Sequence, residues 1–167
     1  GYQNYTTECS TPTEFTVYFD ANGHGTAPDA QIVASGQKAT APTPAPTATG
    51  YTFGGWYKEP ECQNVFDFNT AIIADITLYA KWTAIQTTIT LNANGGSGNT
   101  TSVAATYDSS TLNPSSITNP TKTGHTFGGW YSGEGGTGSL VINSSGKLQA
   151  NVSGFTGTSG VWKAITN

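Results

Sequence analysis

The chain has 167 residues, enough for one ordinary domain or two small ones. Only 10% of its residues are charged, its net charge is −4, it has no arginine, and its lysines are scattered. Because nucleic-acid binding needs clustered cations that neutralise phosphates, the composition excludes a nucleic-acid partner. No apolar run approaches the roughly 20 residues of a membrane span, so we expect no membrane insertion in this segment.

The first expected strand covers residues 15–19, where every second residue is apolar and falls on one face. An Asn-Gly pair at 22–23 follows, and it predicts a turn because both residues tolerate a positive φ. A second strand is predicted at 31–33. The proline-rich stretch at 41–46 predicts an extended crossing, because proline lacks the N–H and disfavours a helical residue before it.

Further strands are expected at 51–57, 66–68 and 76–82, followed by a short linker at 84–87. No window of the sequence shows a sustained apolar period of 3.6 residues. The chain is therefore predicted to be mostly β, with almost no helix.

An internal repeat is the most specific signal in the sequence. Residues 46–57 and 120–131 are identical at ten of twelve positions, and both end in Thr-Phe-Gly-Gly-Trp-Tyr. A second match lies upstream, where Ala-Asn-Gly at 21–23 and at 93–95 follows a β-like run in each case. Two matches at nearly the same spacing indicate two tandem units.

The second unit predicts strands at 88–91 and 101–107, but it lacks a counterpart of residues 66–68 and carries a Gly/Ser-rich insertion. Two alignments of its end remain open. Residues 164–167 can match 73–75, which places the closing strand beyond the given sequence, or residues 161–164 can themselves be that strand. We favour the first alignment because Trp162 precedes its lysine, whereas Trp82 follows Lys81. The second unit would then have an open edge and lower stability.

These residues resemble the internalin-type B repeat, also called the Listeria–Bacteroides repeat. Its pattern is a strand ending in Asn-Gly, then Gly-Tyr-x-Phe-x-Gly-Trp-Tyr, Phe-Asp-Phe and Leu-Tyr-Ala-Lys-Trp, all of which the first unit contains. The second unit resembles a longer variant of the repeat. The resemblance implies two small β-grasp-like domains in tandem, at 14–83 and 88–167, after an N-terminal segment at 1–13.

The resemblance also implies a non-catalytic structural or interaction module of a secreted or cell-surface bacterial protein, acting as spacer, stalk or adhesive module. Its partners would be adjacent domains of a larger surface protein, and host or cell-wall proteins or glycans. No cofactor is implied. The chain shows no signal peptide, so it is either cytoplasmic or an exported protein in processed form. Its weakly charged, hydroxyl-rich composition favours the second, with a location outside the cell or at the cell surface.

The motif aromatics have two interpretations. Aromatic side chains bury large areas, and a glycine in a strand allows a ring or backbone to approach closely, so these residues are expected to form the core. The alternative is a carbohydrate- or protein-binding module whose exposed aromatics stack on a ligand. The structural motif comprises Phe53, Gly55, Trp56, Tyr57, Trp82, Phe127, Gly129, Trp130 and Tyr131.

Sites for chemistry are weakly supported. Asp20, Asn22 and His24 are spaced as in part of a calcium loop, but the further acidic ligands are missing, so we expect a plain turn and no metal. The two histidines and the scattered carboxylates suggest no catalytic group, so we expect no enzyme. Cys9 and Cys62 are predicted to form a disulfide, with two unrelated thiols as the alternative.

Overall fold

The structure is a computed structural model that describes residues 13–166. It is mostly β: in these residues the only helices are two short 3-10 turns, η1 (Glu134–Gly136) and η2 (Thr158–Gly160). Neither has the length or apolar character of a membrane span. The described residues divide into two compact units, one comprising residues 13–48 and 53–82 and the other residues 49–52 and 83–166.

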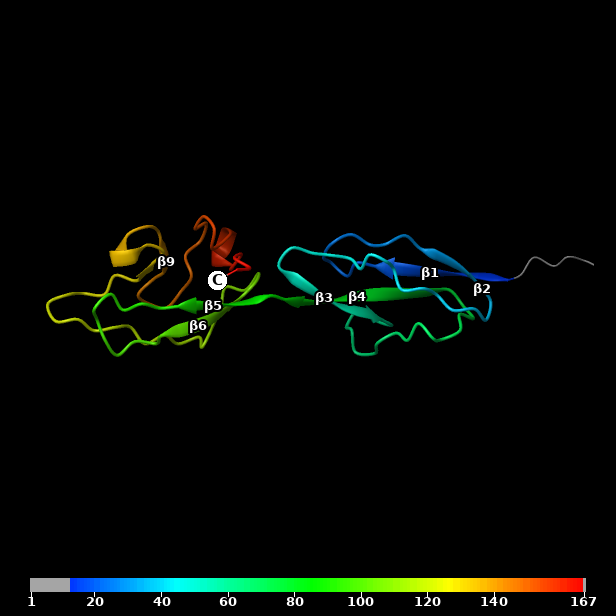
Figure 1. Ribbon diagram of the computed structural model, residues 1–167, viewed down its shortest axis with the longest axis horizontal. Coiled ribbons are helices and arrows are strands. Elements are labelled where there is room, and N and C mark those ends of the chain that lie inside the picture. Colours follow the sequence, from blue (N-terminus) through cyan, green and yellow to red (C-terminus); the bar gives the residue numbers. More distant parts are fainter. Residues whose placement is uncertain (1–12, 167) are drawn as a thin grey trace, which may run out of the picture. The chain divides into compact units, whose positions relative to one another are not determined.

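The first unit is a four-stranded mixed sheet with the strand order β2-β1-β4-β3 (Figure 1). Strand β1 pairs antiparallel with β2 and parallel with β4. This order, with its first and last strands parallel at the centre, matches the β-grasp-like sheet that the family resemblance implies. The strands are β1 (Glu14–Asp20), β2 (Gln31–Ala34), β3 (Tyr51–Tyr57) and β4 (Ile76–Ala84).

The core of the first unit follows from the period-two patterns of its central strands. Val17 and Phe19 on β1 are 0% and 6% exposed, and Leu78 and Ala80 on β4 are both fully buried. Phe19 lies directly opposite Leu78 in the parallel ladder, so the two apolar faces coincide. Alternate burial along a strand is what one covered sheet face requires.

The prediction of a strand at 66–68 is wrong. Residues 66–68 form no strand, because Asp67 starts a turn: its Oδ1 accepts the Asn69 N–H at 2.8 Å and its carbonyl accepts the Thr70 N–H at 2.9 Å. Aspartate favours this local bonding over a sheet ladder. Phe66 and Phe68 still contact each other edge-to-face at 5.0 Å, and Phe66 is buried.

The second unit has a three-stranded antiparallel sheet in the order β5-β6-β7 and a separate two-stranded sheet of β8 and β9. Strand β5 begins only two residues after β4 ends, so most of the segment predicted as a linker at 84–87 lies in strands. The bounds are β5 (Gln86–Thr90), β6 (Ser102–Thr106), β7 (Leu112–Asn113), β8 (Trp130–Tyr131) and β9 (Leu140–Ile142).

The predicted Asn-Gly turns are present in both units and share their geometry. Asn22 and Asn94 have φ angles of 51° and 49°. Each donates its backbone N–H to the side-chain oxygen two residues earlier, at 2.7 Å to Asp20 and 2.8 Å to Asn92. The side chain at the first position therefore serves as a turn acceptor in each unit.

The two units differ after this turn. In the second motif only Trp130 and Tyr131 lie in a strand, and residues 125–129 lie outside any strand. The C-terminal residues do not extend the sheet beside β5: Trp162 exchanges backbone bonds with Asp108 and Ser109, and Lys163 donates to Phe155. The alignment that makes residues 161–164 a closing strand beside β5 is therefore not what the structure contains.

Candidate functional site

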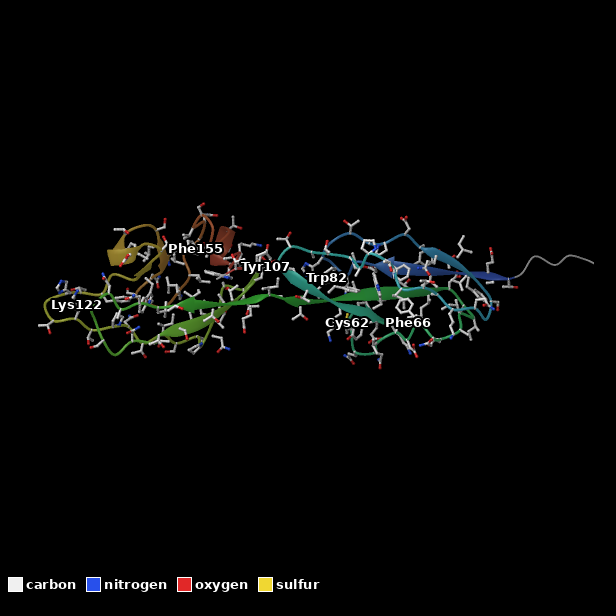
Figure 2. The ribbon with its side chains drawn as sticks, viewed as in Figure 1. Cys62, Phe66, Trp82, Tyr107, Lys122 and Phe155 are labelled. Atoms are coloured by element: carbon white, nitrogen blue, oxygen red, sulfur yellow. The ribbon has the colours of Figure 1, made fainter. Side chains whose placement is uncertain are left out.

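The first motif is packed into the core of its unit. Trp56 is 4% exposed and meets Phe19 and Phe53 edge-to-face, with ring centroids at 4.8 and 5.4 Å. Phe53 also meets Trp82 at 5.5 Å. The Trp82 Nε1 donates to the Ala21 carbonyl at 2.8 Å, so the end of β4 holds the Asn-Gly turn in place. Figure 2 labels Trp82 and Phe66 in this unit.

Two of the remaining residues of the first motif, Gly54 and Tyr57, contact Lys81. Tyr57 is half-buried, and the Lys81 ammonium lies 4.9 Å from its ring centroid. A Cβ on Gly54 would lie 3.4 Å from Lys81 Cγ, an ordinary van der Waals contact, so the lysine stem passes over this glycine without requiring it. Gly55 has a φ of +103°, which favours glycine at this position. The motif is thus a packing arrangement with one cation–π contact.

The second motif repeats the ring contact in a different setting. Phe127 and Trp130 meet at 5.0 Å, and Trp130 is 7% exposed. Gly129 has a φ of +120°, and a Cβ there would lie 2.5 Å from Leu140 Cδ1. Tyr131 is 42% exposed. Among the described residues the buried Nε1 of Trp130 has no acceptor, which is costly for a donor removed from water.

A groove of about 640 Å³ lies beside the second motif. One wall is β5 with the turn that follows it, from Ile89 to Asn94, and the other is the motif segment from His125 to Trp130. Phe155 and Trp162 also line it. Its walls combine apolar rings with backbone and amide groups, which suits a ligand that offers both.

The insertion closes the core of the second unit, a role that the sequence reasoning missed. Trp162 is 4% exposed, and its Nε1 donates to the buried Thr87 hydroxyl at 2.8 Å. Leu148 and Val152 join the same core, and Phe155 packs against it (Figure 2). The only available signal was the recurrence of single apolar residues within the Gly/Ser-rich stretch.

A polar cluster in the second unit was also missed, because its members are far apart in sequence. Tyr51 donates its phenol to Asp108 at 2.9 Å, and the Lys163 ammonium pairs with the same carboxylate. Burial and this hydrogen bond raise the pKa of Tyr51, and the hydrogen bond to Asp108 raises the pKa of Lys163. Lys163 also lies 4.8 Å from the centroid of the Tyr107 ring.

The half-buried Cys62 has a free thiol that contacts two carbonyls, of Pro60 at 3.5 Å and Ala80 at 3.7 Å. Asn22 Nδ2 contacts the same sulfur at 3.5 Å and donates to both carbonyls. Cys9 lies outside the described residues, so its disulfide with Cys62 stays a prediction.

The histidines have local contacts. His24 meets the Trp82 ring edge-to-face at 6.4 Å, and His125 Nδ1 lies 2.9 Å from the Thr123 carbonyl. Within residues 13–166, no group of three metal-ligating side chains comes together. The structure supplies two aromatic motifs, each with a buried tryptophan, and a groove beside the second motif.

Comparison with known proteins gives the family. The model of the Listeria-Bacteroides repeat domain matches residues 15–81 and 88–153. The chain belongs to this family. The two B repeats inferred from the sequence are thereby confirmed, and residues 154–167, with Phe155 and Trp162, lie beyond the second match.

The relatives of these B repeats include much longer bacterial proteins. Internalin H of Listeria monocytogenes is 38% identical over 126 residues, which is 74% of this chain and 21% of that protein. A putative membrane protein of Evansella cellulosilytica is 36% identical over 121 residues, covering 72% and 17%. A putative Gly-rich membrane protein of that organism is 35% identical over 119 residues, covering 71% and 13%. The chain thus spans about a fifth or less of the length of these relatives.

Proposed function

We propose that the chain is a non-catalytic spacer module of a bacterial cell-surface or secreted protein, which holds neighbouring domains of that protein apart. One observation carries the proposal: the first and last strands of the first unit, β1 and β4, lie side by side and parallel. The chain therefore enters this unit at one end of the sheet and leaves it at the other.

This geometry suits a module under tension. When the ends of the first unit are pulled, β1 and β4 are drawn in opposite directions along their length. The hydrogen bonds between them, over the stretch where Val17 lies opposite Ile76 and Asp20 opposite Tyr79, are then loaded together in shear. A ladder that shares load over several bonds resists pulling better than one that opens a bond at a time.

Burial of the motif supports a spacer over an aromatic binding platform. Trp56 and Trp130, the largest aromatics of the two motifs, are 4% and 7% exposed. A sugar ring cannot stack on a tryptophan ring that the core already covers. The names of the relatives, an internalin and two putative membrane proteins, support a location outside the cytoplasm or at the cell surface.

Single-molecule pulling of the full chain tests the spacer role. Tyr18 is 49% exposed and lies opposite Thr77 on β4, so Tyr18→Pro removes a donor on the β4 side of β1. We expect this change to lower the unfolding force of the first unit. Tyr18→Thr keeps the donor and should leave the force unchanged. Equal forces for the proline and threonine variants would contradict a load-bearing ladder.

The adhesive alternative calls for a separate measurement. Tyr131 is the one exposed Phe, Trp or Tyr of the two motif copies, at 42%. The full chain can be screened against glycans, cell-wall fragments and host surface proteins. Binding that Tyr131→Ala abolishes, without a change in melting temperature, would overturn the spacer assignment and support adhesion through the motif.

A further inference from the structure

The two Asn-Gly turns have the same backbone but different surroundings. In both turns the asparagine and the glycine have positive φ angles, of 51° and 88° at residues 22–23 and of 49° and 82° at residues 94–95. Both pairs follow an alanine in the sequence. A difference in reactivity between the two asparagines therefore has to come from the groups that the fold places around each turn.

An Asn-Gly pair can react with itself. Hydroxide removes the proton of the glycine peptide nitrogen, and this nitrogen attacks the Cγ of the asparagine. The N–Cγ bond forms, the Cγ–Nδ2 bond breaks, and the amide leaves as ammonia with a proton from water, which regenerates the hydroxide. Water then opens the succinimide ring at either carbonyl and gives aspartate or isoaspartate. Glycine favours the attack because it has no Cβ to shield its nitrogen.

The fold opposes this reaction at Asn22. The residue is half-buried, and its Nδ2 donates to the carbonyls of Pro60 and Ala80 at 2.9 and 3.0 Å. The same nitrogen contacts the Cys62 sulfur at 3.5 Å. Cγ has to turn toward its own backbone before the ring can close, and this rotation breaks both carbonyl bonds. Each broken bond leaves a partly buried carbonyl without this donor, which is costly.

Asn94 is not held in this way. The residue is exposed, and the bonds that it makes with other described residues come from its backbone. Its side-chain amide bonds to none of residues 13–166, so it is free to rotate. The Gly95 N–H, which supplies the attacking nitrogen, also has no acceptor among these residues. Ring closure at Asn94 therefore breaks no bond of the described structure.

A lysine lies where it promotes the attack. Lys122 Nζ donates to the Asn94 carbonyl at 3.1 Å (Figure 2 labels Lys122). This carbonyl and the Gly95 nitrogen belong to one peptide group, so negative charge on the nitrogen spreads to the oxygen that the ammonium contacts. A cation in this place stabilises the reactive anion. The first unit has Ala48 at the position of Lys122, one of the two differences between the motif copies.

The acceptor inside each turn differs in charge as well. The Asn22 N–H donates to the Asp20 carboxylate at 2.7 Å, whereas the Asn94 N–H donates to the neutral amide of Asn92 at 2.8 Å. A carboxylate beside the first turn opposes a second negative charge on the neighbouring Gly23 nitrogen. The side-chain restraint, the cation and the turn acceptor thus all favour reaction in the second turn over the first.

We propose that Asn94 is a self-modification site, where Asn94 converts through a succinimide to aspartate and isoaspartate, and that Lys122 is the positioning residue that promotes the conversion. The second unit then gains one negative charge with time, next to the Lys122 ammonium. Isoaspartate also carries the main chain through its own Cβ and Cγ, which lengthens the turn after β5. The proposal is independent of the spacer role.

Mass spectrometry of the folded full chain tests the site. The chain is kept at mildly alkaline pH, and the peptides that contain residues 22 and 94 are followed for the one-dalton gain that replacing an amide by an acid produces. Asn94→Asp provides the aspartate standard, from which isoaspartate is separated by chromatography. We expect Asn94 to convert at least about tenfold faster than Asn22, because only Asn22 first breaks hydrogen bonds. Equal rates, or a faster rate at Asn22, would overturn the proposal.

The same measurement in denaturing urea separates the fold from the local sequence. Both asparagines lie in the sequence Ala-Asn-Gly, so their rates should become nearly equal once the chain is unfolded. A preference for Asn94 that is as large in urea as in the folded chain would overturn the proposal, because the surroundings described above would then have no effect.

Three variants of Lys122 test its role, with the rate at Asn22 as the internal control. Lys122→Ala introduces the residue of the first unit and should slow conversion of Asn94 about fivefold, the effect of one contacting charge at an exposed site. Lys122→Arg keeps the cation and should keep the rate. Lys122→Gln keeps a donor without the charge and should be as slow as the alanine variant. A glutamine variant as fast as the lysine chain would overturn the electrostatic role of Lys122.

Discussion

Gly50 and Gly124 hold the same place in the two copies of the motif, yet their surroundings differ. Both have positive φ angles, of 81° and 73°. A Cβ on Gly50 would lie 2.3 Å from the Tyr107 ring, whereas a Cβ on Gly124 would meet nothing within 4 Å. The first glycine is thus required by conformation and by space, and the second by conformation alone.

Gly124→Ala should therefore lower the free energy of unfolding by about 1–2 kcal/mol, the cost of a left-handed alanine. Gly50→Ala adds the displacement of a packed ring, which costs a further 1–3 kcal/mol or so. Urea unfolding of the two variants measures the difference. Equal losses would show that the contact of Gly50 with Tyr107 does not constrain this position.

Trp56 is the residue whose loss should damage the first unit most. It is 4% exposed and contacts the rings of Phe19 and Phe53. Trp56→Ala should cost about 3–5 kcal/mol, and Trp56→Phe should cost less because it leaves a smaller cavity. Thermal and urea unfolding measure the loss of stability in each variant. Unchanged stability in the alanine variant would remove the core interpretation of the motif.

The cluster around Asp108 predicts a loss of stability at alkaline pH. Burial and the bond to Asp108 raise the pKa of Tyr51, and the same carboxylate raises the pKa of Lys163. Both folded-state pKa values lie above the unfolded ones, so this stabilisation is complete below the unfolded values, near pH 10, and is lost as the pH rises through the folded ones.

The urea midpoint of the second unit should accordingly be steady up to about pH 9 and fall as the pH rises above about pH 10. Asp108→Asn removes the carboxylate that acts on both groups and should make the fall shallower. A midpoint with the same pH dependence in the asparagine variant would show that Asp108 does not couple to these two groups.

At the scale of elements, strands with a clear alternating pattern were predictable from the sequence. The prediction at 51–57 coincides with β3, and those at 31–33 and 76–82 each lie inside β2 or β4. Failures occurred where local side-chain bonding or tertiary contacts decide the structure. Asp67 turns the chain at 66–68. The second motif repeats the sequence of the first but has no β4-like neighbour among the described strands, and its residues 125–129 form no strand.

The features of the candidate sites were also predictable only where a local sequence pattern marks them. Burial of the motif aromatics follows from their size and from the repeat, both of which are visible in the sequence. The groove could not be predicted, because it depends on which strands fail to pair. The cluster of Tyr51, Asp108 and Lys163 depends on residues more than 50 positions apart. No local pattern marks such contacts.

The loop between β3 and β4 carries the predicted disulfide partner Cys62. A bond to Cys9 would close a loop of about 50 residues and stabilise by about 4 kcal/mol in the chain-entropy model, less any strain. Mass spectrometry of the chain, secreted from a bacterial host and kept without reductant, should find residues 9 and 62 cross-linked, and reduction should lower its melting temperature. Two free thiols in that sample would rule the bond out, in keeping with the free thiol seen at Cys62.

At the scale of the whole molecule, two copies of one repeat reach different degrees of completion. The first unit has β1 paired on both sides, and the second has β5 paired only with β6 among the described strands. The insertion compensates in part, since Trp162 is buried and bonded to Thr87. It leaves Ile89 half-buried, where Val17 is fully buried. We therefore predict that the second unit opens more readily than the first.

Native-state amide exchange at Val17 and Ile89 gives a matched comparison. Both residues lie opposite a partner in an antiparallel ladder, Gln31 for Val17 and Val103 for Ile89, so their local bonding is alike. A difference in protection then reports the stability of each unit and not the presence of a single bond. We expect Ile89 to exchange at least about tenfold faster, which corresponds to about 1.4 kcal/mol in opening free energy. Protection of Ile89 equal to that of Val17 would contradict this prediction. It would mean that the insertion stabilises β5 as fully as a second neighbouring strand stabilises β1.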